Sequence, residues 1–458
     1  MKCCILLATA LFVSAVAAAA TPPNVVFIIA DDLGWTDLGC QGSTYYETPN
    51  IDSLAANGMR FMRYYSSPNC TPSRAALVTG QYGPRTGAYT VGTAERGLAE
   101  DRKLTVPVNV TNLPLDRATI GNVFKSAGYA TGLFGKWHLG DDGPYHPGQR
   151  GFDEALVTMG AHVNFVTTPP VEHPKDEYLA DFLTDRGVDF IERHKAEPFF
   201  LYLAHFGVHS PHDAKADYVE RWKSKPPAEK HWNPLYAAMI QSVDESVGRI
   251  SETLERLGLT ENTVVIFVSD NGGIGGYERT EPPFDGRSVT DNSPLRAGKG
   301  TLYEGGLRPP FIVRWPGHVP GRAVCNTPIA HVDLLPTLAE IAGAPLPKQP
   351  LDGLSFTPLL RDPTATLGRD AIYVHFPVYI ESYFHPRGWR TSPAGAIVTD
   401  EWKLIEFFET GRKELYNLQD DIGEFTDLYT ARPEIARELE KKLQVWREGI
   451  GAYMPERK

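Results

Sequence analysis

Short apolar runs alternate with stretches of helical periodicity along most of this chain, and this alternation restricts its fold more than any other feature. Apolar residues recur at helical spacing from Pro234 to about Leu257, and Gly258 can end that helix. A shorter helix is expected over Ile120–Ala127, with Thr119 as its N-cap. Five runs predict buried strands: Asn24–Ala30, Ala130–Phe134, Pro198–Ala204, Thr263–Ser269 and Phe311–Arg314. The pattern predicts an α/β fold with a large mixed, mostly parallel sheet covered by helices on both faces.

The pattern changes after about Arg361. Short runs at Ala396–Val398, Lys403–Phe407 and Lys413–Leu415 predict antiparallel strands, and a last helix is expected from Pro433 to about Gly449. We therefore expect a large α/β domain over residues 21–361. A smaller C-terminal α+β subdomain, with a short antiparallel sheet and a helix, should occupy residues 362–458.

The first residues have the layout of a secretory signal peptide. Lys2 precedes an apolar run from Ile5 to Val16, and small residues follow at Ala17–Ala20. Residues 1–20 are therefore expected to be cleaved, which predicts a secreted or periplasmic protein. The apolar run is short for a membrane-spanning helix and no second one follows, so no membrane span is expected.

Charge and cysteine content exclude two further classes. The formal net charge is −11 and no basic stripe is visible, which disfavours nucleic acid as a partner. An anionic substrate must therefore be held by a local group of cations. Removal of the signal peptide leaves Cys40, Cys70 and Cys325, too few for a disulfide scaffold. The sequence leaves open whether Cys40 pairs with Cys325 and whether the sequon at Asn109 is glycosylated.

Oxygen donors follow two of the predicted strands. Asp31 and Asp32 come directly after the first, and Asp270 and Asn271 follow Thr263–Ser269. Open α/β sheets bind ligands beyond the carboxyl ends of their strands. Adjacent carboxylates repel unless a cation lies between them. Such hard ligands suit Ca²⁺, and Mg²⁺ less, whereas a zinc site would be expected to use His or Cys.

The segment Cys-Thr-Pro-Ser-Arg, residues 70–74, lies between these strand ends and opens a predicted helix. Thr71 can cap that helix, Pro72 suits its first position and Gly80 can end it. Cys70 would then stand at a helix amino terminus, where free N–H groups stabilise a negatively charged nucleophile. Arg74 in the first turn opposes the helix dipole, so another interaction should explain it.

This pentapeptide resembles the signature of the formylglycine-dependent type I sulfatases of the alkaline phosphatase superfamily. The resemblance implies that a formylglycine-generating or equivalent maturation enzyme converts Cys70 to formylglycine, whose hydrate attacks the sulfur of a sulfate ester. Residues 21–361 would then be the catalytic domain. Further segments similar to the family follow in order at Gly135–Gly140, Val208–Pro211, Gly298–Gly306 and Glu414–Leu418.

The resemblance also implies roles for individual residues. The metal would be held by Asp31, Asp32, Cys70, Asp270 and Asn271. Lys136, His209 and Lys299 would bind the sulfate, with His209 or Lys299 giving a proton to the departing alcohol. His138 would accept the proton whose loss frees the sulfate, and Arg74 would orient the nucleophile and the metal ligands.

Substrate identity is the least constrained property. Turn-rich loops at residues 83–118, 141–177 and 273–298, and an aromatic and basic stretch at Tyr383–Arg390, are expected near the leaving group. A sulfated carbohydrate is expected rather than a steroid or lipid, with aryl sulfates as simpler substrates. Two alternatives stay open: a phosphodiester or phosphonate monoester hydrolase of the same superfamily, and a catalytically silent glycan-binding protein with unmodified Cys70.

Overall fold

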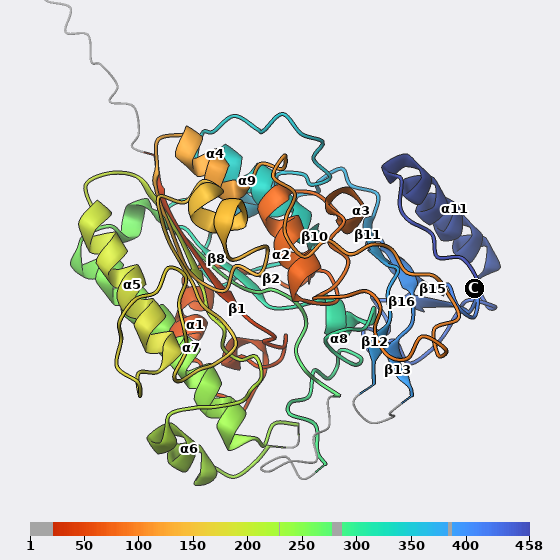
Figure 1. Cartoon of the computed structure of the whole chain (residues 1–458), viewed down its shortest axis with the longest axis horizontal. Helices are drawn as coiled ribbons and strands as arrows, with labels where there is room; N and C mark the ends of the chain where they lie inside the picture. Colours follow the sequence, from red (N-terminus) through yellow and green to blue (C-terminus); the bar gives the residue numbers. More distant parts are fainter. Residues whose placement is uncertain (1–21, 229, 277–285, 383–386) are drawn as a thin grey trace, which may run out of the picture.

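An eight-stranded sheet forms the centre of the protein (Figure 1). The computed structural model describes residues 22–228, 230–276, 286–382 and 387–458, so the predicted signal peptide lies outside it, as do parts of the 273–298 loop and of Tyr383–Arg390. The strands lie in the order β5 (Glu154–Val157), β4 (Ala130–Gly135), β6 (Phe199–Ala204), β1 (Asn24–Ala30), β7 (Thr263–Ser269), β8 (Phe311–Arg314), β2 (Met59–Phe61) and β9 (Ala323–Cys325).

Most of this sheet is parallel. The pairings from β5 across to β7 are parallel, and β8 runs antiparallel to both of its neighbours. The prediction of a mixed, mostly parallel sheet is confirmed. In the described part of the chain, no helix is long and apolar enough to cross a membrane.

Strand β1 shows why helices must cover both faces. All seven of its residues are buried, and successive side chains point to opposite faces of the sheet. Val25, Phe27 and Ile29 join the core under one layer, and Val26 and Ile28 join the other. The first layer contains α2 (Cys70–Thr79), α4 (Ile120–Ser126) and α9 (Leu334–Ile341); the second contains α1 (Pro49–Ala56), α5 (Leu179–His194) and α7 (Pro234–Arg256).

Local capping chemistry explains one predicted helix start and corrects another. Thr119 caps α4, because its hydroxyl accepts a hydrogen bond from the Asn122 N–H. Helix α2 begins at Cys70 with Asn69 in the N-cap position, so the prediction that Thr71 caps it and Pro72 starts it was wrong. Proline is tolerated throughout the first turn, where N–H groups have no intrahelical partner. Gly80 ends α2 in the left-handed region, at φ 69°, as expected.

The C-terminal part forms a second, antiparallel sheet in the order β11 (Ile372–Phe376), β14 (Ala394–Val398), β15 (Trp402–Phe407) and β16 (Lys413–Asn417). Helix α11 (Pro433–Ile450) packs Leu439 and Leu443 against one face, on Ile397 and Leu404. The other face joins a core with buried residues of the larger part, including Leu307. A ribbon of β12 (Ile380–Glu381) and β13 (Trp389–Thr391) lies beside this sheet (Figure 1).

The remaining elements connect these layers. They are β3 (Tyr64–Tyr65), which pairs with β10 (Ile329–Ala330), and the helices α3 (Gly83–Thr86), α6 (Ala216–Lys223), α8 (Glu304–Leu307) and α10 (Thr357–Arg361).

The structure bears on two questions that the sequence left open. Cys40 and Cys325 are both free, so they form no disulfide with each other. The Asn109 side chain donates to the carbonyls of Thr90, at 2.9 Å, and Gly92, at 2.6 Å. A glycan on that nitrogen would remove one of the two hydrogens that hold this loop.

Candidate active site

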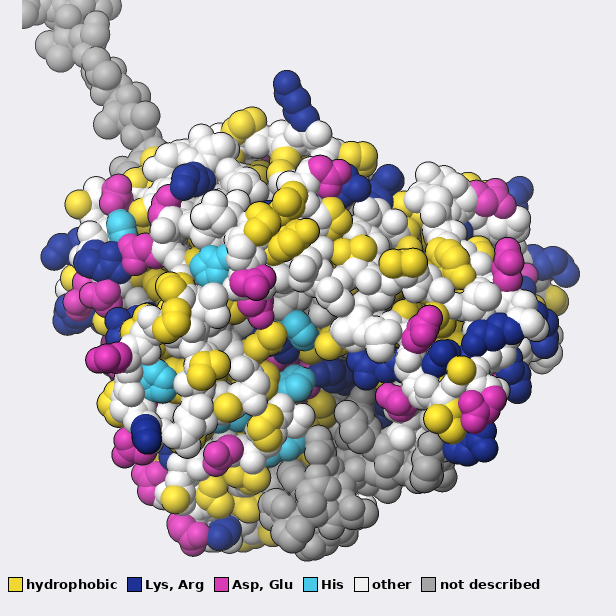
Figure 2. All heavy atoms as spheres, in the orientation of Figure 1, with side chains coloured by type: hydrophobic (Ala, Val, Ile, Leu, Met, Phe, Trp, Pro, Cys, Tyr) yellow, Lys and Arg dark blue, Asp and Glu magenta, His cyan; other side chains and the backbone are white. Residues whose placement is uncertain are grey.

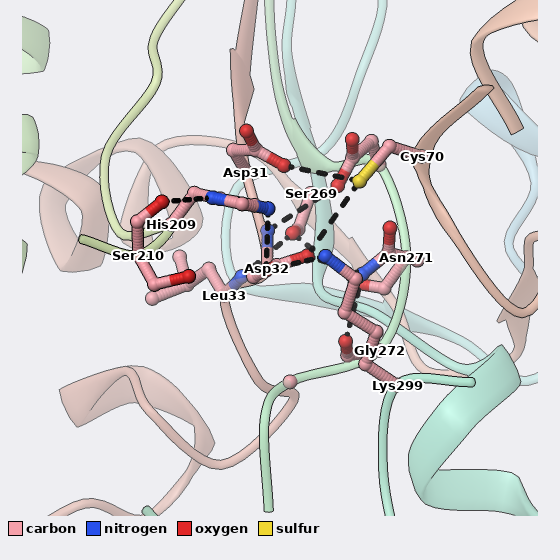
Figure 3. A network of polar contacts seen from close by, with 12 residues as sticks. Asp31, Asp32, Leu33, Cys70, His209, Ser210, Ser269, Asn271, Gly272 and Lys299 are labelled. Atoms are coloured by element: carbon pink, nitrogen blue, oxygen red, sulfur yellow. Dashed lines mark hydrogen bonds and ion pairs between the residues drawn. The ribbon is translucent and has the colours of Figure 1, made fainter. Parts of the chain in front are cut away.

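The carboxyl ends of β1 and β7 bring the predicted oxygen donors together (Figure 3). The two strands pair in parallel with Ala30 opposite Ser269, so the residues that follow leave the sheet side by side. The Asp32 N–H donates to Asp270 Oδ1 at 3.3 Å, and the Asn271 amide donates to Asp32 Oδ1 at 2.8 Å. Asp32 adopts φ 65°, a left-handed conformation that non-glycine residues adopt mainly where the surroundings enforce it.

Cys70 points toward this carboxylate group from the first turn of α2. Its Sγ lies 3.5 Å from Asp31 Oδ1 and 3.9 Å from Asp32 Oδ1. Burial raises the pKa of the Cys70 thiol, although Lys136 and Lys299 oppose that effect. An unmodified thiol would therefore stay protonated at neutral pH and would be a poor nucleophile.

Each of the three carboxylates has its own cation. Lys136 Nζ lies 2.5 Å from Asp31 Oδ2, and Lys299 Nζ lies 2.7 Å from Asp32 Oδ2. Arg74 Nε donates to Asp270 Oδ2 at 2.9 Å. The bond to Asp270 accounts for Arg74, whose position in the first turn of α2 opposes the helix dipole. The three ion pairs keep the buried charges compensated.

The protonation preferences of the carboxylates differ. Burial raises the pKa of Asp31, but Lys136 and the cations around it hold that pKa well below its usual value. Lys299 has the same net effect on Asp32, whose pKa is lowered despite burial. Burial and the neighbouring Asp31 charge raise the pKa of Asp270 to about 6. Asp31 and Asp32 are therefore anions at neutral pH, and Asp270 takes up a proton most readily.

Two histidines face the same site. His209 Nε2 lies 3.6 Å from Asp32 Oδ2 and its Nδ1 lies 2.5 Å from the Ser210 carbonyl oxygen. Burial, with Lys299, lowers the pKa of His209 to about 4. Burial, with Lys136, lowers the pKa of His138 well below its usual value. Both imidazoles are neutral near pH 7, so each has a nitrogen able to accept a proton.

A pocket of about 520 Å³ opens over Cys70. His and basic side chains gather near the middle of the face drawn in Figure 2. Five predicted site residues line the pocket: Cys70, Lys136, His138, His209 and Lys299. The other predicted residues, Arg74, Asp31, Asp32, Asp270 and Asn271, are buried beside them. The rest of the lining includes Val91, Arg96 and Met159, which lie in loops expected near the leaving group, and Ile380 and Glu381, which sequence reasoning missed.

The residues present fit a divalent cation. Ligand atoms of Asp31, Asp32, Cys70 and His209 all lie within 4.8 Å of one another. Within the described ranges, the buried Asn271 Oδ1 has no hydrogen-bond partner, although it adjoins Asp32. Both oxygens of Asp270 already accept hydrogen bonds, from Asp32 and Arg74. His209, predicted as a sulfate ligand and proton donor but not as a metal ligand, thus joins this group of potential ligands.

Comparison with known proteins agrees with this geometry. Residues 23–344 match the family model described as Sulfatase, and residues 298–449 match the model described as N-sulphoglucosamine sulphohydrolase, C-terminal. The chain belongs to the sulfatase family. This sulfatase is 34% identical to a protein named Sulfatase from Formosa agariphila, over 93% of this chain and 88% of that protein. It is 36% identical to human Arylsulfatase A, over 75% of this chain and 68% of the relative.

A solved structure supports the same assignment. The sulfatase superposes on Ps i-CgsB with a TM-score of 0.78 and 29% identity, over 93% of each chain. That protein has also been solved in complex with k-i-k-neocarrahexaose. The chain is therefore a sulfuric ester hydrolase, as the pentapeptide and its surroundings predicted.

Proposed function

We propose that this sulfatase hydrolyses sulfate esters of carbohydrates, with a formylglycine made from Cys70 and with a bound calcium ion. The observation that carries the proposal is the position of Cys70, which lies at the base of the pocket beside two lysines, two histidines and a carboxylate cluster. A sulfate group needs convergent cationic donors, and a chain of net charge −11 provides them only locally.

Conversion of Cys70 explains how so unreactive a thiol serves as the nucleophile. The hydrated aldehyde supplies a hydroxyl oxygen that attacks sulfur, which a buried, protonated thiol does poorly. Cys70 is 0% exposed in the folded chain. We infer that the maturation enzyme acts before the fold closes around residue 70.

The surrounding side chains bind the sulfate, transfer protons and orient the reacting group. Lys136, His209 and Lys299 hold the sulfate, and Lys299, or His209 once it has taken up a proton, gives a proton to the departing alcohol as the bond between sulfur and the alcohol oxygen breaks. The neutral imidazole of His138 accepts the proton whose loss frees the sulfate. Arg74 orients the reacting group, because it fixes Asp270 and donates to the Lys136 carbonyl at 2.7 Å.

Asp31, Asp32, Asp270 and Asn271, with residue 70, would hold the calcium ion. Bound there, the ion adds positive charge where sulfate oxygens become more negative. Their oxygen donors favour Ca²⁺, with Mg²⁺ second. Asp31 and Asp32, already anionic at neutral pH, would bind it without releasing protons.

Relatives and the pocket support the carbohydrate assignment. A mouse relative named N-acetylgalactosamine-6-sulfatase is 33% identical to this chain. The pocket volume of about 520 Å³ suits a small polar ligand. Residues 1–20 would direct the protein to the periplasm or outside the cell. Residues 21–361 would form the catalytic domain and residues 362–458 the C-terminal subdomain.

Mass spectrometry of the peptide that contains residue 70, from protein made in its native host, tests the nucleophile. We expect an aldehyde or its hydrate in active protein, and no activity in Cys70→Ala. Active protein that carries only the thiol would contradict the proposal.

Removal of metal with a chelator should abolish activity, and Ca²⁺ should restore it better than Mg²⁺. Matched aryl sulfate and aryl phosphate esters complete the test, with the sulfate expected to react faster.

A further inference from the structure

The wall of the pocket that faces Cys70 is built from segments far apart in the sequence. Val91 and Arg96 come from the loop after α3, Met159 follows β5, and Ile380 and Glu381 belong to β12 in the C-terminal part. This wall is where the alcohol part of a substrate would lie once its sulfate contacts Lys136 and Lys299. Its side chains therefore face the leaving group rather than the sulfur.

Arg96 and Glu381 form a loose pair on this wall. Arg96 Nη1 lies 3.8 Å from Glu381 Oε2, too far for a hydrogen bond between them. Arg96 Nη2 donates to the Val91 carbonyl at 2.6 Å. In the part of the chain that the structure describes, neither Arg96 Nη1 nor Glu381 Oε2 has a hydrogen-bond partner, whereas Arg96 Nε is buried. The pair thus keeps both donor and acceptor capacity for a third molecule.

Both partners are held in place by the chain around them. Glu381 Oε1 accepts from the Gly97 N–H at 3.0 Å, and Arg102 Nη1 donates to the carbonyls of Arg96, at 2.7 Å, and Gly97, at 3.0 Å. The Trp389 ring lies so close to Gly97 that a Cβ there would come within 2.5 Å of it. The loop and the ribbon are therefore fixed against each other, which preorganises the pair.

We propose that Arg96 and Glu381 form a subsite that recognises neighbouring hydroxyl groups on the sugar that carries the sulfate ester. The inference rests on the proposed function and adds the side chains that choose its leaving group. A sugar hydroxyl both donates and accepts, so one can accept from Arg96 while its neighbour donates to Glu381.

The chemistry of the wall favours hydroxyls over a second sulfate. The opposite charges of Arg96 and Glu381 nearly cancel, so the subsite has little attraction for another anion, and Glu381 repels one. Val91, Met159 and Ile380 offer apolar contact beside the pair. A sugar ring presents this combination, with hydroxyls at its edge and C–H groups on its face.

The test compares two substrates in four proteins. The variants are Arg96→Met, Glu381→Gln and a control, Arg85→Met. Arg85 matches Arg96 in exposure, because the side chains are 30% and 29% exposed. Arg85 Nε lies 2.8 Å from Asp352 Oδ1, and Arg85 does not belong to the pocket lining. The substrates are p-nitrophenyl sulfate and whichever member of a panel the wild type cleaves best. The panel holds N-acetylgalactosamine 6-sulfate, galactose 6-sulfate and neocarrahexaose. Thermal melting checks that each variant folds.

We expect each pocket variant to lower kcat/KM on the sulfated sugar about 10- to 100-fold, with the aryl sulfate changed less than about twofold. The control should leave both rates near wild type. Equal losses on both substrates, or no loss on the sugar, would overturn the subsite. A wild type that cleaves the aryl sulfate but no sugar would also overturn it and would leave the sulfatase activity standing. A wild type with formylglycine and calcium that cleaves neither substrate would overturn the proposed function as well.

Discussion

Two clusters of buried charge can be compared within this one molecule. The first surrounds Cys70 at the carboxyl ends of β1 and β7. The second lies where β15 meets α8, and there Lys403 Nζ is 2.9 Å from a carboxylate oxygen of both Glu304 and Glu424. The side chains of this second cluster are 0% exposed, whereas Lys299 and His209 in the first are 15% and 26% exposed.

The clusters also differ in what lies beside them. Glu304 accepts from Tyr65 and Arg308 as well as from Lys403, and the Glu304 N–H donates to Glu424 at 2.7 Å. Although burial raises the pKa of Glu304, Lys403 and Arg308 hold it at about 2. Within the described residues, both clusters hold buried atoms without a hydrogen-bond partner: Asn271 Oδ1 and Arg74 Nη2 in the first, and Glu424 Oε1, beside Lys403, in the second. The pocket over Cys70 is lined by Lys136 and Lys299 of the first cluster and by no residue of the second. Buried charge that is sealed stabilises the fold, whereas buried charge beside a pocket is available for chemistry.

The largest effect should come from breaking the first cluster. We expect Asp31→Asn to lower kcat/KM about 10³-fold or more, because it removes a proposed metal ligand and the partner of Lys136. The melting temperature should fall as well, because the buried Lys136 loses its partner, so activity is compared on protein that is still folded. Steady-state kinetics and thermal melting measure the two quantities. Asp352→Asn, which alters a pair with Arg85 outside the pocket, is the control. A variant that melts early but stays active when folded would contradict the comparison.

Breaking the second cluster should lower the stability of the protein but leave its activity largely intact. Lys403→Met leaves two buried carboxylates without their cation, so the free energy of unfolding should fall by about 3–5 kcal/mol. The protein that remains folded at low temperature should keep most of its activity. Urea unfolding provides the measurement. Lys413→Met on the next strand is the control, because Lys413 is 22% exposed and its pair with Glu440 should contribute about 0–1 kcal/mol. Equal decreases in the free energy of unfolding for Lys403→Met and Lys413→Met would show that the complete burial of Lys403 is unimportant for stability.

A titration can separate the C-terminal part from the catalytic cluster. Burial lowers the pKa of His375 on β11 to about 4. The hydrogen bond to the Tyr453 carbonyl opposes this effect, and the charge of Arg447 adds to it. The unfolded chain, with a histidine pKa of about 6.5, therefore binds the proton first as pH falls. Stability should decrease from about pH 6.5 toward 4, by about 2 kcal/mol between pH 7 and pH 5 from this group. His375→Gln should flatten that part of the curve in urea unfolding. Parallel curves for the two proteins would refute the assignment.

The smallest effect concerns a link between the two parts of the chain. Arg390 on β13 donates to the carbonyls of Lys299, at 2.6 Å, and of Gly275, at 3.1 Å. It is a positioning residue, because it acts through the loop that carries Lys299. Arg390→Gln should lower kcat about 5- to 10-fold, and Arg390→Lys should recover part of the loss. Stopped assays with an aryl sulfate substrate measure kcat and KM for the wild type and both variants. A change in KM alone, with no recovery of kcat in Arg390→Lys, would contradict the positioning role of Arg390.

The catalytic cluster was largely predictable, because its geometry follows from local rules. Acidic residues directly after two buried strands must meet when those strands pair in parallel, and Asp32 and Asp270 do so. Cys70 was placed correctly at a helix amino terminus, although the start of that helix was shifted. First-turn positions are hard to order from sequence, since several residue types tolerate unpaired N–H groups there.

The pocket wall was not predictable in the same way. The loop containing Arg96 was expected near the leaving group, but nothing in its composition distinguishes Arg96 from Arg102. Glu381 lies in a two-residue strand with no periodic pattern to mark it. Lys403 resembles any lysine of a short strand, and its complete burial was not foreseen.

By itself, the sequence predicted five strands of the central sheet and three of the C-terminal sheet, several helix ends, the place of Cys70 at a helix amino terminus and the oxygen donors after two strands. These depend on side-chain alternation, capping and residues next to strand ends, all of which act over a few positions. Only the tertiary structure decided which charges are sealed, which adjoin a pocket, and which distant side chains face the leaving group. Those properties depend on how segments pack together, because burial and the energy of a charge are set by every neighbour in space.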